Sequence, residues 1–191
     1  HEVAKAWNNE SACVGMTVGG LSHHLLAQAG HVVSGLDTPP SSEPPIALLD
    51  HYARADWVTA GHDDEANASI RVRADDSATD GHATVLAQAA RSLAHLPEVL
   101  GAPRSPDSVY IPWQGWSLTT DDFLATRAME VVVHSDDLAA SVGVPTPEFP
   151  DNVIEHVVHL LCGVALRRHG QEALIRTLSR PQRAPGSVAA F

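Results

Sequence analysis

The sequence predicts an all-α fold, most simply a four-helix bundle with additional short helices. Three observations support this. Several long segments repeat apolar residues at helical spacing, strand-like sequence is confined to one short run, and proline- or glycine-rich stretches separate the helical segments. The chain has 191 residues, of which 44% are hydrophobic and 18% charged. This composition is typical of a globular protein, and we expect residues 1–191 to form a single domain.

The first half of the chain is expected to contain helices separated by two loops. Helical sequence is expected at 1–8, where a helix ends in a turn, at 17–35, where it is broken at Gly35, and at 46–60 and 80–96. Residues 37–45 must form a loop, because four prolines in nine residues cannot continue a helix. Residues 63–81 are polar and hold the strand-like run 69–73, so we expect a second loop there.

The second half begins with an irregular crossing at 97–112, where four prolines mark the bends. Thr119 or Thr120 can cap the following helix, which is expected to end at Gly143. Another helix should run from Pro150 to about His169. A short helix at 171–178 and a tail containing proline and arginine complete the prediction.

Residues 127–143 contain the most informative pattern, because Arg127, Glu130, His134 and Asp137 fall on one stripe of the predicted helix. At about 100° per residue they lie within roughly 80° of arc. The rest of this helix is largely apolar, which indicates that it is buried. Burying these side chains together is costly unless they pair or bind a metal. We interpret the stripe as half of a metal site.

The helix expected at 17–35 can supply the other half. One face of this helix carries both apolar and polar side chains: Leu21, His24, Leu25, Gln28, His31 and Val32. With Glu130 and His134, His24 would complete a set of three ligands that suits zinc and related divalent ions. A fourth position would remain for water or substrate. His23 is rotated by about 100° from this face and is the weaker alternative.

Structural interpretations compete with these functional ones. Arg127 could simply pair with a carboxylate such as Glu130 or Asp137. Asp137 could cap a chain reversal or hold the imidazole of His134 in one tautomer. His31 and Gln28 could contact a ligand, or they could be core residues with satisfied hydrogen bonds.

Other residues are expected to be structural. Cys13 and Cys162 sit among apolar neighbours, as small core residues do. We expect Trp113 and Trp116 to pack against the end of the bundle, and the alternative is that they stack on a ligand.

Charge and hydropathy exclude several kinds of partner. The formal net charge of -11, from 12 basic and 23 acidic residues, argues against nucleic acid as a partner. Apolar runs are too short for a membrane span, and two cysteines give no disulfide framework. A cytoplasmic protein with a small-molecule substrate is the simplest interpretation. The sequence is compatible with a homodimer but shows no exposed stripe that demands one.

Two segments resemble a known superfamily. GWSLTTDDFLATRAMEVVVHSDDLAASVG, residues 115–143, resembles the signature helix of the DinB and mycothiol-dependent maleylpyruvate isomerase superfamily, and the earlier MTVGGLSHHL is similar to its first motif. The resemblance implies a DinB-like bundle in which His24, Glu130 and His134 bind a divalent metal, typically zinc. Arg127 and Asp137 match flanking motif positions, and we assign them supporting roles in catalysis. Gln28 and His31 are assigned to cofactor or substrate binding.

The resemblance also implies chemistry. Several members of this superfamily bring a low-molecular-weight thiol such as mycothiol to the metal, and coordination deprotonates the thiol. We therefore expect a metal-dependent thiol transferase or isomerase that acts on an electrophilic metabolite. The founding isomerase carries a further C-terminal domain, so its specific reaction does not transfer directly. Two alternatives are a hydrolase that uses metal-bound water and a non-catalytic, metal-stabilised bundle.

Overall fold

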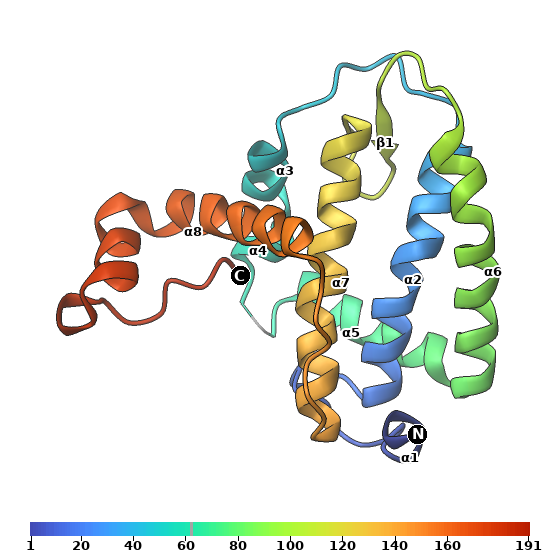
Figure 1. Ribbon diagram of the computed structural model, residues 1–191, viewed down its shortest axis with the longest axis horizontal. Helices are drawn as coiled ribbons and strands as arrows, with labels where there is room; N and C mark the ends of the chain where they lie inside the picture. The colour runs from blue at the N-terminus through green and yellow to red at the C-terminus, as the bar shows by residue number, and fades with distance from the viewer. Residues whose placement is uncertain (62) are drawn as a thin grey trace.

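The computed structural model describes residues 1–61 and 63–191 and is predominantly helical (Figure 1). The elements, in chain order, are α1 Glu2–Lys5, α2 Val18–Asp37, α3 Leu48–Arg54, α4 Asp56–Thr59, α5 Glu65–Ala78, α6 His82–Gly101, β1 Val109–Ile111, β2 Trp116–Leu118, α7 Thr120–Val142, α8 Asp151–Ser179 and the 3-10 helix Pro181–Arg183. The predicted all-α class is confirmed. Of the helices, none is both long and apolar enough to cross a bilayer, within the part of the chain that the structure describes.

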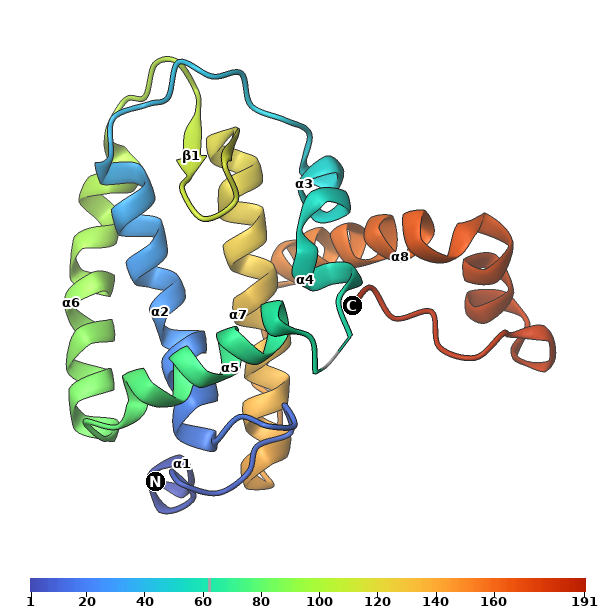
Figure 2. The same ribbon diagram turned by 180° about the vertical axis from the view of Figure 1, so that it is seen from behind.

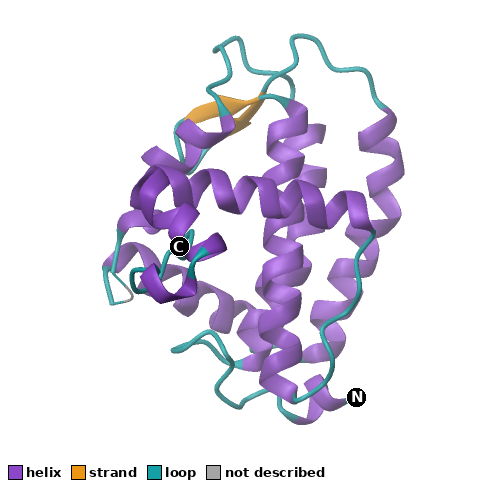
Figure 3. Ribbon diagram, turned by 60° about the vertical axis from the view of Figure 1, so that its left-hand side comes forward, coloured by secondary structure: helices purple, strands orange, loops and turns teal. Residues whose placement is uncertain are grey.

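Three long helices, α2, α6 and α7, stand side by side, with α2 between the other two (Figures 1 and 2). Helix α5 crosses α2 near the end where α2 begins, as Figure 2 shows. Helix α8 packs on α7 and α3 but extends away from the bundle (Figures 1 and 2), and in Figure 3 it crosses in front of the other long helices. The antiparallel strands β1 and β2 form a hairpin beside the end where α7 begins, with Tyr110 paired to Ser117 (Figure 3).

Among the residues that the structure describes, buried apolar side chains form three core clusters. The largest joins α3, α4, α7 and α8 through Tyr52, Met129 and Val157. A second packs the hairpin onto the first turn of α7 at Phe123. The third joins α5 to the start of α2 through Leu21. Helices α2 and α7 are therefore held at both ends, which fixes how their facing side chains meet.

The prediction of a loop at 63–81 is wrong, because most of this segment forms helix α5. This helix buries Ala74 and Ala78 rather than large side chains, so its apolar periodicity is weak. Alanine is nevertheless the strongest helix former, and the strand-like residues Ile70 and Val72 are accommodated within the helix. Asp75 fixes α5 in place, because its Oδ1 accepts hydrogen bonds from the backbone N and the Oγ1 of Thr17.

Three expected boundaries also differ. Helix α2 passes through Gly35 to Asp37, and the ring of Phe123 packs where a Cβ at Gly35 would lie. The 46–60 segment is divided into α3 and α4. Helix α6 continues beyond Pro97, whose missing N–H frees only the carbonyl of Leu93 on an exposed side of the helix. The helices expected at 150–169 and 171–178 are both present, joined by a kink at Gly170.

His51 makes stability depend on pH. It is buried in α3, and its Nδ1 accepts a hydrogen bond from the indole N of Trp116 at 3.0 Å. Burial, followed by the charge of Arg127, lowers the pKa of His51 to about 4, although Glu130 opposes the shift. The unfolded chain, with an ordinary histidine pKa near 6.5, therefore binds this proton first on acidification. We expect the free energy of unfolding to fall by about 3 kcal/mol from this residue alone between pH 6.5 and 4.

Urea titrations of the metal-free protein across this pH range measure the effect. His51→Gln keeps an acceptor for Trp116 but has no proton to gain, so its pH dependence should be shallower than that of wild type by that amount. Identical slopes in the two proteins would show that His51 does not titrate in this way.

Candidate metal site

Helix α7 carries the polar stripe that the sequence predicts. Thr119 caps it by accepting a hydrogen bond from the backbone N of Asp122, and Gly143 ends it in a left-handed conformation. Both of these predicted boundaries are confirmed. The stripe faces α2, the central helix, which is capped by Thr17 in the same manner. The two helices thus bring their polar side chains together inside the bundle.

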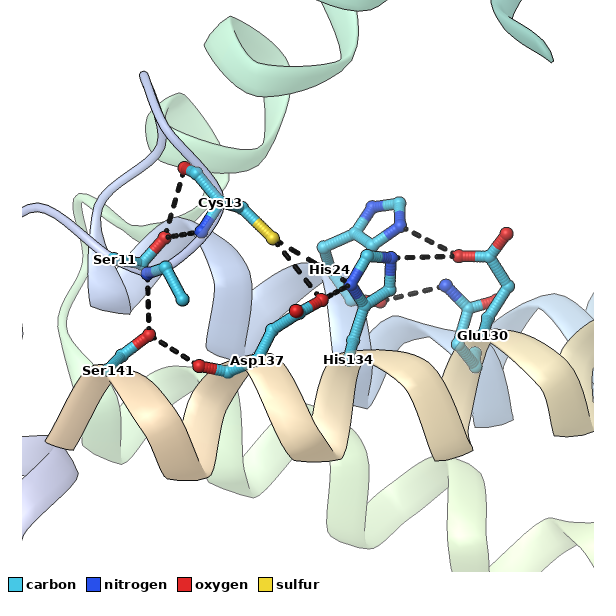
Figure 4. Close-up of polar contacts among 9 residues, drawn as sticks. Ser11, Cys13, His24, Glu130, His134, Asp137 and Ser141 are labelled. Carbon is cyan, nitrogen blue, oxygen red and sulfur yellow. Dashed lines mark hydrogen bonds and ion pairs between the residues drawn. The ribbon is translucent and has the colours of Figure 1, made fainter. Parts of the chain in front are cut away.

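His24 from α2 meets Glu130 and His134 from α7 (Figure 4). Oε2 of Glu130 lies 3.2 Å from Nε2 of His24 and 3.2 Å from Nε2 of His134. The two imidazole rings lie nearly perpendicular to one another, with centroids 4.9 Å apart. All three potential ligand atoms fall within 4.8 Å of one another. Two imidazole nitrogens and a carboxylate oxygen thus converge on one point, as a metal site requires.

The electrostatics of this cluster favour charged side chains. Burial would raise the pKa of Glu130, but hydrogen bonds from His134 and His24 outweigh it and hold that pKa well below its usual range. Burial likewise opposes protonation of His134. Hydrogen bonds with Asp137, Cys13 and Glu130 and the charge of Glu130 together outweigh burial, and they raise the pKa of His134 to about 11. A divalent cation at this point would take the place of the positive charge on His134.

Asp137 lies behind His134, with Oδ2 2.9 Å from Nδ1 of the imidazole. The hydrogen bond from His134 lowers the pKa of Asp137, which keeps it a carboxylate. A carboxylate in this place fixes the ring and leaves Nε2 to face Glu130 and His24. Of the two roles that the sequence leaves open for Asp137, this geometry matches the one that holds His134 in a single tautomer.

Cys13 is a member of the cluster that the sequence does not reveal. Its thiol donates a hydrogen bond to Oδ2 of Asp137 at 3.4 Å, and its Sγ lies 4.0 Å from Nδ1 of His134. Cys13, His134 and Asp137 thus form a second group of potential ligands around the other nitrogen of the same ring. Ser141 anchors the loop, because its Oγ accepts from the backbone N of Ala12 (Figure 4). No spacing in the sequence links residue 13 to α7.

Arg127 and Gln28 form a connected pair next to the cluster. Nη1 of Arg127 donates to Oε1 of Gln28 at 2.7 Å, and Nε2 of Gln28 donates to the carbonyl of His24 at 2.9 Å. Gln28 is only 1% exposed, so it holds Arg127 and the backbone of His24 rather than facing a ligand. The alternative that Arg127 pairs directly with a carboxylate is replaced by this contact with a neutral amide.

A pocket of about 800 Å³ opens above the cluster. Its lining includes His24, Glu130 and His134 together with Arg127 and residues of α5. His31 also lines it, and burial, followed by the charges of Arg127 and His24, lowers the pKa of His31 to about 4. Nδ1 of His31 is buried and has no hydrogen-bond partner among the described residues. A buried polar atom without a hydrogen-bond partner is uncommon in folded proteins.

Trp113 and His23 also lie on the wall of this pocket. Trp113 is 63% exposed and lies at the turn between β1 and β2, beside His31 and on the pocket wall. The expectation that it packs against the bundle end is therefore wrong, whereas Trp116 does contact His51. His23 also lines the pocket, but the triad that brings ligand atoms together contains His24.

Comparison with known families agrees with the sequence pattern. The model of the mycothiol maleylpyruvate isomerase N-terminal domain matches residues 2–139, which is most of the chain. The chain belongs to this family. The matched region includes α1 to α6 and the polar stripe of α7, whereas α8 lies outside it. No curated protein and no solved structure gave a significant match.

Removing Gln28 should destabilise the fold. We expect Gln28→Leu to lower the free energy of unfolding by about 1–3 kcal/mol, because it leaves Nη1 of the partly buried Arg127 guanidinium without its hydrogen-bond acceptor. Urea denaturation measures the loss. The same change at the exposed Gln171 is the control and should alter stability by less than about 0.5 kcal/mol. Equal effects would mean that the Gln28 contacts contribute nothing.

Proposed function

We propose that this chain is a metal-dependent enzyme of the thiol S-transferase or isomerase type, acting on an electrophilic small metabolite. His24, Glu130 and His134 would hold a divalent ion, most simply zinc, and mycothiol or another small thiol would be the nucleophile. The observation that carries the proposal is the convergence of these three side chains in the lining of a pocket of about 800 Å³. Family membership adds the thiol, since mycothiol is part of the family's description.

The donor set fits a catalytic metal better than a structural one. Structural zinc sites are usually closed by four protein ligands, whereas catalytic sites use three and leave one position open. Two histidines and one glutamate are a ligand set of the catalytic kind. When bound, a divalent ion supplies the charge that lowers the pKa of a thiol or of water near neutral pH. The size of the pocket leaves room for a substrate beside it.

Side chains around the triad would orient its ligands and bind the thiol or the metabolite. Asp137 accepts the Nδ1 proton of His134 and so directs the unprotonated Nε2 toward the ion. Arg127 places a positive charge on the pocket wall, where it would bind an anionic group of the thiol or the metabolite. Gln28 positions this guanidinium. His31, neutral near pH 7 because of its lowered pKa, would offer a ring nitrogen for a hydrogen bond to the ligand.

Turnover measurements with and without mycothiol test the proposal. The zinc-loaded protein would be assayed with maleylpyruvate and, separately, with chlorodinitrobenzene as a general electrophile. We expect thiol-dependent consumption of at least one of them, reduced at least about 100-fold in Glu130→Gln.

Two other outcomes of these assays would favour the alternative functions, a hydrolase or a structural metal site. Metal-dependent hydrolysis of an ester or amide substrate without any thiol would favour the hydrolase. A protein that loses folding stability without zinc, and turns over nothing with it, would favour a structural metal.

A further inference from the structure

Helix α6 has two apolar faces, and its own chain covers only one. The covered face packs on α2 and buries Val85, Ala89 and Val99. The second face carries five residues that alternate at spacings of four and three. We call Leu86, Ala90, Leu93, Pro97 and Leu100 the α6 stripe.

All five residues of the α6 stripe are exposed. The exposed fractions of Leu86, Leu93 and Leu100 are 55%, 55% and 50%. Figure 1 places α6 at the edge of the bundle, beside α2 and away from α8. Spacings of four and three are those of a helix that packs against another helix along its length. A contiguous apolar face of this kind on a protein surface marks an interaction site.

The charges around the α6 stripe favour a second copy of the same chain as its partner. Arg91 and Glu98 are the formally charged residues of α6, and the helix is neutral within a chain of net charge -11. Each of them follows a stripe residue directly and is therefore turned about 100° away from it. Two copies can thus bring these faces together without opposing like charges. A helix that binds a lipid surface is instead rich in basic residues, whereas α6 carries one basic and one acidic residue.

We propose that the α6 stripe is the contact surface of a homodimer in which the two α6 helices pack antiparallel about a two-fold axis. With residues 82–101 fully overlapped, Leu93 of one copy faces Ala90 of the other, and Leu86 faces Pro97. Leu100 then faces Ala83. Each leucine meets a smaller residue, so the two surfaces interdigitate. The contact is self-complementary, as a two-fold interface requires, and antiparallel helix dipoles attract.

The expected dimer is weak. A helix of 20 residues is about 30 Å long, and a single helix pair gives an interface at the small end of those that are stable in solution. We expect a dissociation constant on the order of micromolar. The dimer does not require the metal or the thiol, so its test is independent of the proposed enzymatic activity.

Sedimentation velocity over a range of protein concentrations tests the proposal. Wild type should shift from monomer to dimer, and Leu93→Glu should weaken the dimer at least about 100-fold, because two carboxylates would be buried at its centre. Leu178→Glu, at an even more exposed leucine of α8, is the matched control and should leave the dimer unchanged. Circular dichroism would confirm that both variants stay helical.

Cross-linking tests the antiparallel arrangement. A mixture of Ala83→Cys and Leu100→Cys proteins should form a disulfide between residues 83 and 100 of different chains, identified by peptide mass spectrometry. Each variant alone should form much less of its own disulfide. A wild type that stays monomeric at high concentration, a dimer that survives Leu93→Glu, or self-pairing of each cysteine variant would overturn the proposal.

Discussion

Purified Glu130→Gln protein is expected to lose its bound metal, whereas wild type should carry about one zinc equivalent per chain. Oε2 of Glu130 lies 3.2 Å from Nε2 of His24 and from Nε2 of His134. Glu130 is therefore the residue that joins the two histidines in the triad, and it is the only one of the three that supplies a carboxylate. Glutamine keeps the shape but removes the negative charge that offsets a divalent cation. Replacing a residue that only hydrogen-bonds to a metal ligand typically lowers metal affinity by about 10–100-fold. Loss of a ligand itself should therefore lower zinc affinity by more than about 100-fold. Equilibrium dialysis followed by elemental analysis measures this.

Glu155→Gln makes the same change at an exposed position of α8 and is the control for Glu130→Gln. It should bind zinc as wild type does. Circular dichroism of each protein separates loss of metal from loss of fold. Equal metal content in Glu130→Gln and wild type would defeat the assignment of Glu130 as a ligand.

Asp137→Asn is expected to weaken zinc binding by about 10–100-fold without abolishing it. The carboxylate accepts the Nδ1 proton of His134 at 2.9 Å, whereas an asparagine offers a weaker, neutral acceptor or turns its NH₂ toward the ring. The imidazole then loses its fixed orientation and some of its basicity. Competition with a chromophoric zinc chelator gives the dissociation constant.

Asp136→Asn is the matched control for Asp137→Asn. Asp136 is the preceding residue of α7, but it is exposed and accepts a hydrogen bond from Thr146 rather than from a histidine. Its replacement removes the same charge from the same helix and should change zinc affinity by less than about threefold. If the two variants weakened binding equally, Asp137 would act through long-range charge and not through His134.

The polar stripe of α7 could be predicted because helical periodicity alone places Arg127, Glu130, His134 and Asp137 on one face. The same reasoning places His24 on the inner face of α2. Periodicity says nothing about loops, so Cys13, which reaches the cluster from the loop before α2, could not be found in this way. The partner of Arg127 cannot be predicted either, because the sequence does not distinguish an amide from a carboxylate partner until α2 and α7 are placed side by side.

Helix α5 and the α6 stripe show two further limits of the sequence pattern. The buried positions of α5 are alanines, which contribute helix propensity but little apolar contrast against polar neighbours. In α6 apolar residues occupy two adjacent faces, so the sequence cannot distinguish the face that meets α2 from the face left exposed. Only the packing of α6 on α2 separates them.

Two of the three proposed ligands share α7, and the third stands alone on α2. The separation between Glu130 and His134 is set by one turn of a continuous helix and is insensitive to the rest of the molecule. The reach of His24 depends on how closely two independent helices approach, and the contact of Phe123 with Gly35 is one of the spacers that sets it. Affinity for the ion therefore depends on the distance between α2 and α7. Substitutions far from the ligands, at such spacers, should tune that affinity while leaving the pair on α7 intact.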